Sequence, residues 1–255
     1  MAGAMVEGWQ EAGIDFDDVT VIRPSGTPVE GVSTVTNYPE FERPRFVMLG
    51  FKPQKLDEVA PGLAPHVGED CVVISMLAGV SAATLRSRFP AAKSIVRVMP
   101  NLPVAQGQGV TAVYSADGDQ DRLADIEQLF ASLGMTAWCE KEEELGVIGA
   151  IASAGIAYVA RFAAALGKSG EAMGMQPGLA EQVAIQTLVG TAAYAADTGA
   201  AMSEIARRVA SPKGTTEEGL AVLDAESGLQ QLVNKTIEAA VRRSKELAEE
   251  AARRN

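Results

Sequence analysis

The chain has 255 residues, of which 47% are hydrophobic, and a formal net charge of −11. This length leaves room for one large or two modest domains with a proper core. The acidic balance, with a pI near 4.7, argues against nucleic acid or an anionic membrane as a partner. A single histidine and two distant cysteines argue against a soft metal site and against a Ser-His or Cys-His nucleophile. We therefore expect no metal, and any enzymatic chemistry has to come largely from a bound cofactor.

The two cysteines and the longest apolar segment bear on where the protein is located. Cys71 and Cys139 each lie in an apolar run and are expected to be small core hydrophobes, which favours a cytoplasmic location. The longest apolar candidate, residues 147–166, is rich in Ala and Gly and contains Arg161. We predict a buried helix there rather than a membrane span.

The N-terminus has the apolar spacing of a helix, with Met1, Met5, Val6 and Trp9 on one side. In a dinucleotide-binding domain, a first strand and a Gly-rich turn lead into such a helix. The sequence begins without that strand and those glycines. We therefore expect the first strand to be missing and the pyrophosphate-binding turn to be incomplete.

Two short β-type runs follow, at 19–22 and 32–35. In a Rossmann layout, an acidic residue after the second strand binds the ribose 2′-hydroxyl and favours NAD. Because the first strand is expected to be missing, the run at 19–22 corresponds to the second strand of that layout. After this run the chain offers Arg23, Ser25 and Thr27 instead of an acidic residue. A guanidinium group with hydroxyls suits a 2′-phosphate, so we prefer NADP(H), with NAD(H) possible. An ordinary Pro-Ser-Gly turn with a solvated arginine is a serious alternative.

The middle of the chain alternates between strands and helices, which is typical of a doubly wound α/β domain. Strands are predicted at 46–51, 72–77, 94–99, 109–114 and about 135–139, and helices at 53–66, 82–89 and 119–133. The acidic run at 140–144 marks the end of this pattern. We predict a Rossmann-like domain over residues 1–141 and a helical domain over 142–255.

No β pattern is present after residue 145. Helices are predicted at about 145–169, 177–198, 201–209, 215–226 and 228–250, with breaks at Gly170, at 174–178 and at Thr198-Gly199. The first of these helices is apolar almost all round, so it has to be buried, and the helical part offers few partners within one chain.

Two loops are candidates for ligand binding. Pro100 and Pro103 stiffen a loop around Asn101, at the carboxyl end of a predicted strand, where open α/β sheets bind ligands. A plain strand-to-strand turn explains the same spacing about as well. Residues 211–216 precede a helix, and Thr215 or Thr216 can cap it. The helix N-terminus there suits a small carboxylate, although a simple capped helix start is the alternative.

These two loops carry a family resemblance. The sequence RVMPNLP at 97–103 followed by Gly107 and Gly109, and SPKGTT at 211–216, resemble the motifs of pyrroline-5-carboxylate reductases. The resemblance implies an NAD(P)-binding Rossmann-like domain followed by an all-α dimerisation domain. It also implies NAD(P)H-dependent reduction of a small cyclic imino acid, 1-pyrroline-5-carboxylate, to L-proline. The expected assembly is a homodimer, with a larger homo-oligomer built from such dimers as the alternative.

The resemblance also implies site residues. With Arg23 and Ser25, the expected cofactor-binding residues are Asn37, Gly50, Phe51, Lys52, Pro53, Met76, Leu77, Ala78, Pro100 and Asn101. The expected substrate-binding residues are Glu142, Ser211, Gly214, Thr215 and Thr216. Thr216 is the expected catalytic residue, with its hydroxyl on the side of the ring nitrogen in a positioning role. For Glu142, a solvated helix start is at least as good an explanation.

One segment departs from the family pattern. The family's Ser-Gly-Ser-Gly-Pro-Ala-Tyr reads Ala-Ser-Ala-Gly-Ile-Ala-Tyr at 152–158. This change favours, as an alternative, a related imine or keto-acid reductase with a different substrate. The missing phosphate-binding turn favours another alternative, a catalytically silent dimerising homologue.

Overall fold

The computed structural model describes residues 1–38, 43–117 and 120–254. It divides into two compact units. The first comprises Met1–Ser153 with the end of the chain from Val241, and the second comprises Ala154–Ala240. The predicted boundary between residues 141 and 142 stays a prediction.

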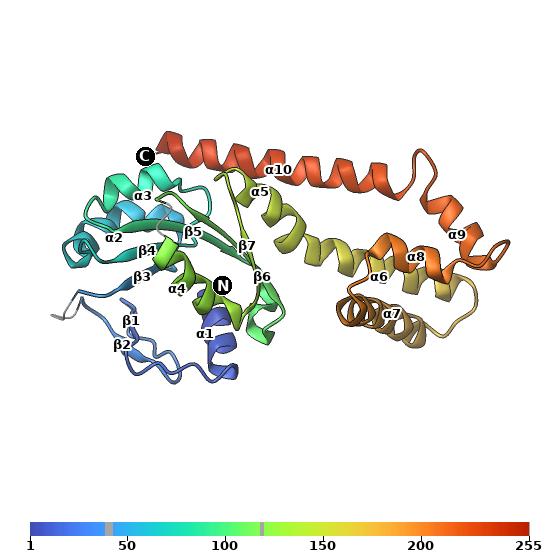
Figure 1. Cartoon of the computed structure of the whole chain (residues 1–255), viewed down its shortest axis with the longest axis horizontal. Helices are drawn as coiled ribbons and strands as arrows, with labels where there is room; N and C mark the ends of the chain where they lie inside the picture. The colour runs from blue at the N-terminus through green and yellow to red at the C-terminus, as the bar shows by residue number, and fades with distance from the viewer. Residues whose placement is uncertain (39–42, 118–119, 255) are drawn as a thin grey trace. The chain divides into compact units, whose positions relative to one another are not determined.

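The first unit is built on a five-stranded sheet (Figure 1). Its strands follow chain order: β3 (Phe46–Leu49), β4 (Val72–Ser75), β5 (Ser94–Pro100), β6 (Gly109–Ser115) and β7 (Gly134–Trp138). Neighbours pair in parallel except for β5 and β6, which are antiparallel. Residues 101–108 are too few for the crossover that a parallel pair requires. The predicted α/β class is confirmed, with this reversal in the middle of the sheet.

Helices cover both faces of this sheet (Figure 1). On one face, α2 (Leu56–Leu63) and α3 (Ala82–Arg88) pack with Val73 and Ile95 of the strands. On the other, α1 (Ala2–Glu11) and α4 (Gln120–Ala131) pack with the alternate strand residues. This two-sided burial explains the continuous apolar runs of the strands. The predicted helix at 53–66 is α2 flanked by the short 3₁₀ helices η1 (Pro53–Lys55) and η2 (Ala64–His66).

The predicted N-terminal helix is confirmed as α1. Met5 and Trp9 are buried, and the Trp9 indole donates to the Leu129 carbonyl over 2.7 Å. Gly8 is also buried, because α1 packs on the 3₁₀ helix η3 (Leu102–Gln106). A Cβ at Gly8 would clash with the Val104 carbonyl, so this close approach requires glycine.

The two early strands are confirmed as β1 (Thr20–Ile22) and β2 (Ser33–Val35). They pair in parallel with each other and form a separate two-stranded sheet.

The predicted helix at 145–169 is interrupted. The structure has α5 (Glu144–Ile148), a π-helical turn η4 (Gly149–Ser153) and α6 (Gly155–Ala172). Gly149 lies against the Met99 sulfur, where a Cβ would clash, so the π turn forms at a point of close packing. The predicted break at Gly170 is wrong, since α6 continues through it. A Cβ there would lie 3.3 Å from the Ala180 Cβ, so this glycine permits helix packing instead.

The second unit contains only helices among its described residues. These are α6, α7 (Pro177–Thr198), α8 (Met202–Val209), α9 (Thr215–Leu223) and the first part of α10 (Leu229–Arg254). Helices α6 and α7 pack closely, because Gly167 lets the Glu181 backbone approach its Cα. These helices confirm the predicted all-α region.

The apolar helix predicted at 145–169 is exposed in the single chain. Among the described residues, the helical stretch Glu144–Ala172 is long and apolar enough to cross a membrane by length and composition. Its most apolar window has a mean hydropathy of 1.7, and only 11% of that window is buried. Val159 and Phe162 of this helix are 53% and 39% exposed in the single chain. Since the sequence offers this helix few partners within one chain, its burial stays a prediction for an assembly.

Candidate functional site

The carboxyl edge of the parallel strands brings several predicted cofactor residues together. Leu49 pairs with Ser75, and the Met76 amide donates to the Leu49 carbonyl over 3.3 Å. Gly50 and Met76 are therefore neighbours where β3 and β4 end. A Cβ at Gly50 would lie 3.1 Å from the Ala2 Cβ, which places the start of α1 at the same edge. A helix N-terminus at this edge is the arrangement that binds a pyrophosphate.

The segment after β4 forms a tight turn. The Ser75 hydroxyl accepts from the Leu77 amide over 3.2 Å, and Gly79 has a φ of +76°. Leu77 is buried, while Ala78 is exposed. This small exposed residue leaves room for a flat ring to approach the backbone.

The predicted cofactor residues after β3 lie in different surroundings. Phe51 packs against the core beside α2, and Pro53 begins η1. Lys52 is exposed and precedes η1, where its carbonyl accepts from the Lys55 amide over 2.9 Å. Of these residues, the Lys52 ammonium group is the one available to an anionic ligand.

Residues 23–27 form an exposed polar turn. The Gly26 amide donates to the Arg23 carbonyl over 2.9 Å, and Arg23 Nη1 donates to the Thr27 carbonyl over 3.3 Å. The Ser25 and Thr27 hydroxyls are 3.0 Å apart. A guanidinium and two hydroxyls thus lie within one turn, a donor set that suits a phosphate. Asn37 is exposed just after β2.

Pro100 and Asn101 belong to the framework of the sheet. Pro100 ends β5 and pairs with Thr111. Asn101 is 5% exposed, its Oδ1 accepts from the Val110 amide over 2.8 Å, and its Nδ2 donates to the Ala152 carbonyl over 3.0 Å. The Asn101 side chain therefore ties the loop after β5 to the π-helical turn.

Glu142 is a structural junction within the first unit. Its Oε1 accepts from the Ala82 amide at the start of α3 over 2.6 Å and from Arg97 Nη1 of β5 over 2.8 Å. The Arg97 and Glu142 side chains are 13% and 25% exposed, so this ion pair is largely shielded from water. Sequence reasoning singled out Glu142 and missed both partners. Only the position of Arg97 in the RVMPNLP motif hinted at one of them.

In the second unit, the predicted substrate residues gather at the start of α9. The Gly214 amide donates to the Ser211 carbonyl over 2.9 Å, and a Cβ on Gly214 would clash with the Ser211 hydroxyl. Thr215 and Thr216 are the first two residues of the helix, and Thr216 is the less exposed of them. Their backbone amides lie in the first turn, where helical amides have no acceptor within the helix.

The predicted threonine cap is wrong. Gly214 is the N-cap residue of α9, and it makes no side-chain cap hydrogen bond. Instead, Glu217 folds back, and its Oε2 accepts from the Lys213 amide over 2.6 Å. A carboxylate three residues into a helix commonly reaches back to an amide before the first turn, and it is favoured there by the helix dipole. Sequence reasoning missed this residue.

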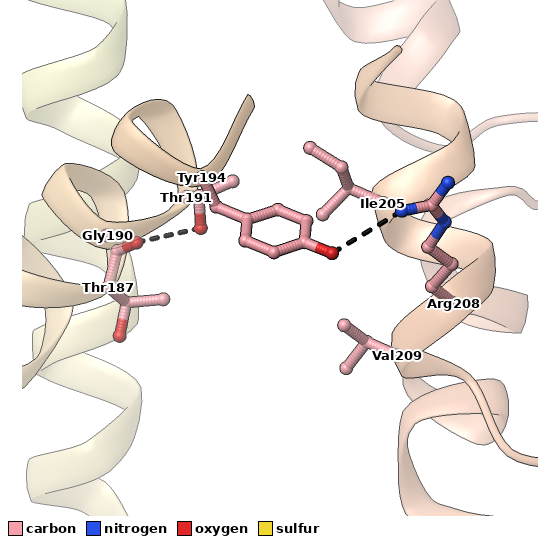
Figure 2. Close-up of a pocket in the computed structure, with 7 residues that line it drawn as sticks. All are labelled: Thr187, Gly190, Thr191, Tyr194, Ile205, Arg208 and Val209. Atoms are coloured by element: carbon pink, nitrogen blue, oxygen red, sulfur yellow. Dashed lines mark hydrogen bonds between the residues drawn. The ribbon is translucent and has the colours of Figure 1, made fainter. Parts of the chain in front are cut away.

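The second unit also contains a cavity of about 470 Å³ between α7 and α8 (Figure 2). It is lined by Thr187, Gly190, Thr191, Tyr194, Ile205, Arg208 and Val209. Its polar groups already have partners. The Thr191 hydroxyl donates to the Thr187 carbonyl over 2.8 Å, and Arg208 donates to the Tyr194 hydroxyl over 3.4 Å and to Glu204 over 2.9 Å. Hydrogen bonds from Arg208 and Arg207 lower the pKa of the Glu204 carboxyl. The free walls of the cavity are therefore mainly apolar.

Comparison with known proteins shows which family the chain resembles. The family model for pyrroline-5-carboxylate reductase dimerisation matches residues 142–247. The pyrroline-5-carboxylate reductase of Pseudomonas aeruginosa is 32% identical over 205 residues, which span 80% of this chain and 75% of that protein. The enzyme of the same name from Synechocystis is 35% identical over 202 residues, spanning 79% and 74% of the two chains.

Solved structures agree with this comparison. A pyrroline-5-carboxylate reductase from Coxiella burnetii matches with a TM-score of 0.88 and 29% identity, over 96% of this chain and 94% of that chain. A pyrroline carboxylate reductase from Plasmodium falciparum, solved with NADP bound, has a TM-score of 0.79 and 24% identity over 96% and 93%. The second likeness supports the fold alone.

Proposed function

Since the chain belongs to the pyrroline-5-carboxylate reductase family, we propose that it reduces 1-pyrroline-5-carboxylate to L-proline with NADPH, as a homodimer. The observation that carries the proposal is the loop at 211–216, which leads into α9 with Thr215 and Thr216 in its first turn. A small carboxylate is the ligand that such a helix start favours.

The substrate carboxylate would bind the first amides of α9, with Ser211 and Gly214 setting the shape of the loop. The Thr216 hydroxyl would then lie on the side of the ring nitrogen. Its role is to orient the imine, because a cyclic iminium accepts hydride readily once it is held in place. No covalent nucleophile is needed.

The carboxyl edge of β3 and β4 would hold a dinucleotide, because the small, exposed Ala78 leaves room for close approach and the start of α1 lies beside Gly50 at the same edge. Gly50, Met76, Leu77 and Ala78 would hold the nicotinamide side. When bound, NADPH supplies the hydride that becomes the new C–H bond at the imine carbon. The electron pair of the C=N bond passes to nitrogen, which keeps its iminium proton and ends as the amine of proline.

The turn at 23–27 is the proposed 2′-phosphate site. Arg23 would pair with the phosphate, and the Ser25 and Thr27 hydroxyls, 3.0 Å apart, would donate to its oxygens. Lys52 adds a cation after β3. This donor set is the reason to prefer NADPH over NADH.

The homodimer is proposed from the exposed apolar side chains of the second unit. Those that are 39% exposed or more on α6 and α7 are Val159, Phe162, Leu166, Leu179, Val183, Ile185, Val189 and Tyr194. So many exposed apolar residues mark an interaction surface. A second copy of a chain with a dimerisation region would cover them, and we propose a cytoplasmic dimer without a membrane partner.

A different cyclic imine is a second candidate substrate. The altered segment 152–158 begins with the last two residues of the π-helical turn, and the Ser153 hydroxyl is buried with no hydrogen-bond partner among the described residues. A substrate with an additional polar group would give this hydroxyl a partner.

The test follows NADPH absorbance with pyrroline-5-carboxylate, with NADH as the parallel cofactor. We expect turnover with a lower KM for NADPH. Arg23→Ala should raise the NADPH KM by about tenfold and leave the NADH KM unchanged, because only NADPH carries the 2′-phosphate. Turnover of other cyclic imines alone would favour the second candidate. Absence of turnover with either cofactor would contradict the proposal.

A further inference from the structure

Lys213, in the loop before α9, has an unusual backbone conformation. Its φ is +57°, and among the described residues it is the one non-glycine residue with a positive φ. In this left-handed region the Cβ crowds the backbone, so a lysine adopts it only when its surroundings hold it there. The loop therefore contains a residue that is under strain and has to be fixed by contacts.

The contact that fixes it comes from Glu217. Glu217 Oε2 accepts from the Lys213 amide over 2.6 Å, which is a charge-assisted hydrogen bond. Two backbone bonds hold Gly214 next to it. Its amide donates to the Ser211 carbonyl over 2.9 Å, and its carbonyl accepts from the Glu218 amide over 3.3 Å. Among the described residues, Glu217 supplies the one side-chain hydrogen bond to the backbone of Lys213 and Gly214.

Lys213 lies two residues before Thr215, so its dihedral angles set the direction in which the chain enters α9. A change of Lys213 to an ordinary negative φ would turn the amides of Gly214, Thr215 and Thr216 relative to a bound carboxylate. We infer that Glu217 is a positioning residue, which holds Lys213 in its left-handed conformation and thereby aims these amides at the substrate carboxylate. This inference rests on the proposed function of the loop.

The carboxylate of Glu217 is itself an anion beside a proposed anion site. If its charge dominated, it would repel the substrate, and its removal would improve binding. The two roles predict opposite changes in KM, so Glu217→Ala and Glu217→Gln separate them. Glutamine removes the charge and keeps an oxygen that can accept from the Lys213 amide.

The kinetic test compares Glu217→Ala, Glu217→Gln and the matched control Glu218→Ala, an exposed glutamate in the same helical turn. We expect Glu217→Ala to raise the KM for pyrroline-5-carboxylate by about tenfold and to change kcat by about twofold or less. Glu217→Gln and Glu218→Ala should stay within about twofold of wild type. With 1-pyrroline, which lacks the carboxylate, Glu217→Ala should leave the KM unchanged.

A second background shows whether Glu217 acts through Lys213. In Lys213→Gly the left-handed conformation is unstrained, so adding Glu217→Ala should raise the KM by about twofold or less. A helix cap that acted only on stability would lower the melting temperature equally in both backgrounds and would affect both substrates. A lower KM in Glu217→Ala, an equal effect on 1-pyrroline, or no rescue by Lys213→Gly would overturn the inference.

Hydrogen exchange separates this inference from the proposed function. The Gly214 amide, which donates to the Ser211 carbonyl, should exchange faster in Glu217→Ala than in wild type and return to the wild-type rate in Lys213→Gly/Glu217→Ala, whether or not the protein turns over substrate. A wild-type protein without turnover would contradict the proposed function. Unchanged exchange in Glu217→Ala would contradict the inference.

Discussion

The two units of the chain bury apolar surface in different ways. In the first unit, large side chains such as Phe89, Phe130 and Leu85 are at most 1% exposed. In the second, the buried residues of α6 and α7 are small: Ala163, Gly167, Ala180 and Ala184. Among the described residues of this unit, the one larger buried residue is Ile205 of α8. The larger apolar residues of α6 and α7 are exposed. The first unit thus has a core of its own, whereas the second leaves its large apolar residues exposed in the single chain.

The largest effect is expected in the core of the first unit. Phe130 of α4 is 1% exposed, and its ring centroid lies 6.2 Å from that of Trp9 in α1. Phe130→Ala should lower the free energy of unfolding by about 3–5 kcal/mol, through lost burial and the cavity left behind. Urea unfolding followed by the fluorescence of Trp9 and Trp138, both in the first unit, measures this change. Met135→Ala, at a residue 65% exposed on β7, is the control and should change it by about 0.5 kcal/mol or less. If both variants lost a similar free energy of unfolding, the stability of the first unit would not depend on its buried side chains as described.

A charge on α6 should affect association and leave the first unit folded. Phe162 is 39% exposed in the single chain, and we expect a second copy to cover it. Phe162→Glu would bury an unpaired carboxylate in that interface, and weaken self-association by about 2 kcal/mol or more. Sedimentation velocity should show a monomer at concentrations where wild type is a dimer, while Lys168→Glu, a charge reversal at an exposed residue of the same helix, should remain a dimer. A Phe162→Glu variant that remained dimeric would place the interface elsewhere.

The helices and strands of both units were predicted well from the sequence, because residues such as proline and glycine mark where they begin and end. Pro177 begins α7, and Gly199, in the left-handed conformation, follows its end, so the predicted range 177–198 matches the structure. The π-helical turn at Gly149–Ser153 was missed, because an apolar pattern of helical spacing does not distinguish an α turn from a π turn. The reversal of β6 could have been predicted, since residues 101–108 are too few for a crossover.

The candidate site was less predictable, because its residues depend on distant partners. Asn101 bonds to Ala152, and Glu142 bonds to Arg97. In each pair the two residues lie about fifty positions apart in sequence. Pairing between residues so far apart is set by the packing of whole elements. Even the local contact of Glu217 with Lys213 was not predicted. Threonine is a common N-cap residue, so the sequence at 215–216 favoured a threonine cap over a glutamate contact.

The smallest effect concerns the two cysteines, both of which belong to the first unit. Burial raises the pKa of the Cys71 thiol from an ordinary value of 9.0 to about 11. The folded state therefore holds this proton more tightly than the unfolded chain does. Its contribution to stability is complete below pH 9 and is lost as the pH rises toward 11. The urea midpoint of the first unit should fall over this range by more in wild type than in Cys71→Ala.

The matched control is Cys139→Ala, in which Cys71 is intact, so most of the alkaline fall should remain. Burial also raises the pKa of the Cys139 thiol, with a further contribution from the nearby Glu144 carboxylate, so this variant should lose a smaller part of the fall. Because the second unit contains no cysteine, its helical signal should show no thiol-dependent change. An equal alkaline fall in wild type and Cys71→Ala would mean that other groups titrate there, and that the buried thiol does not distinguish the first unit from the second.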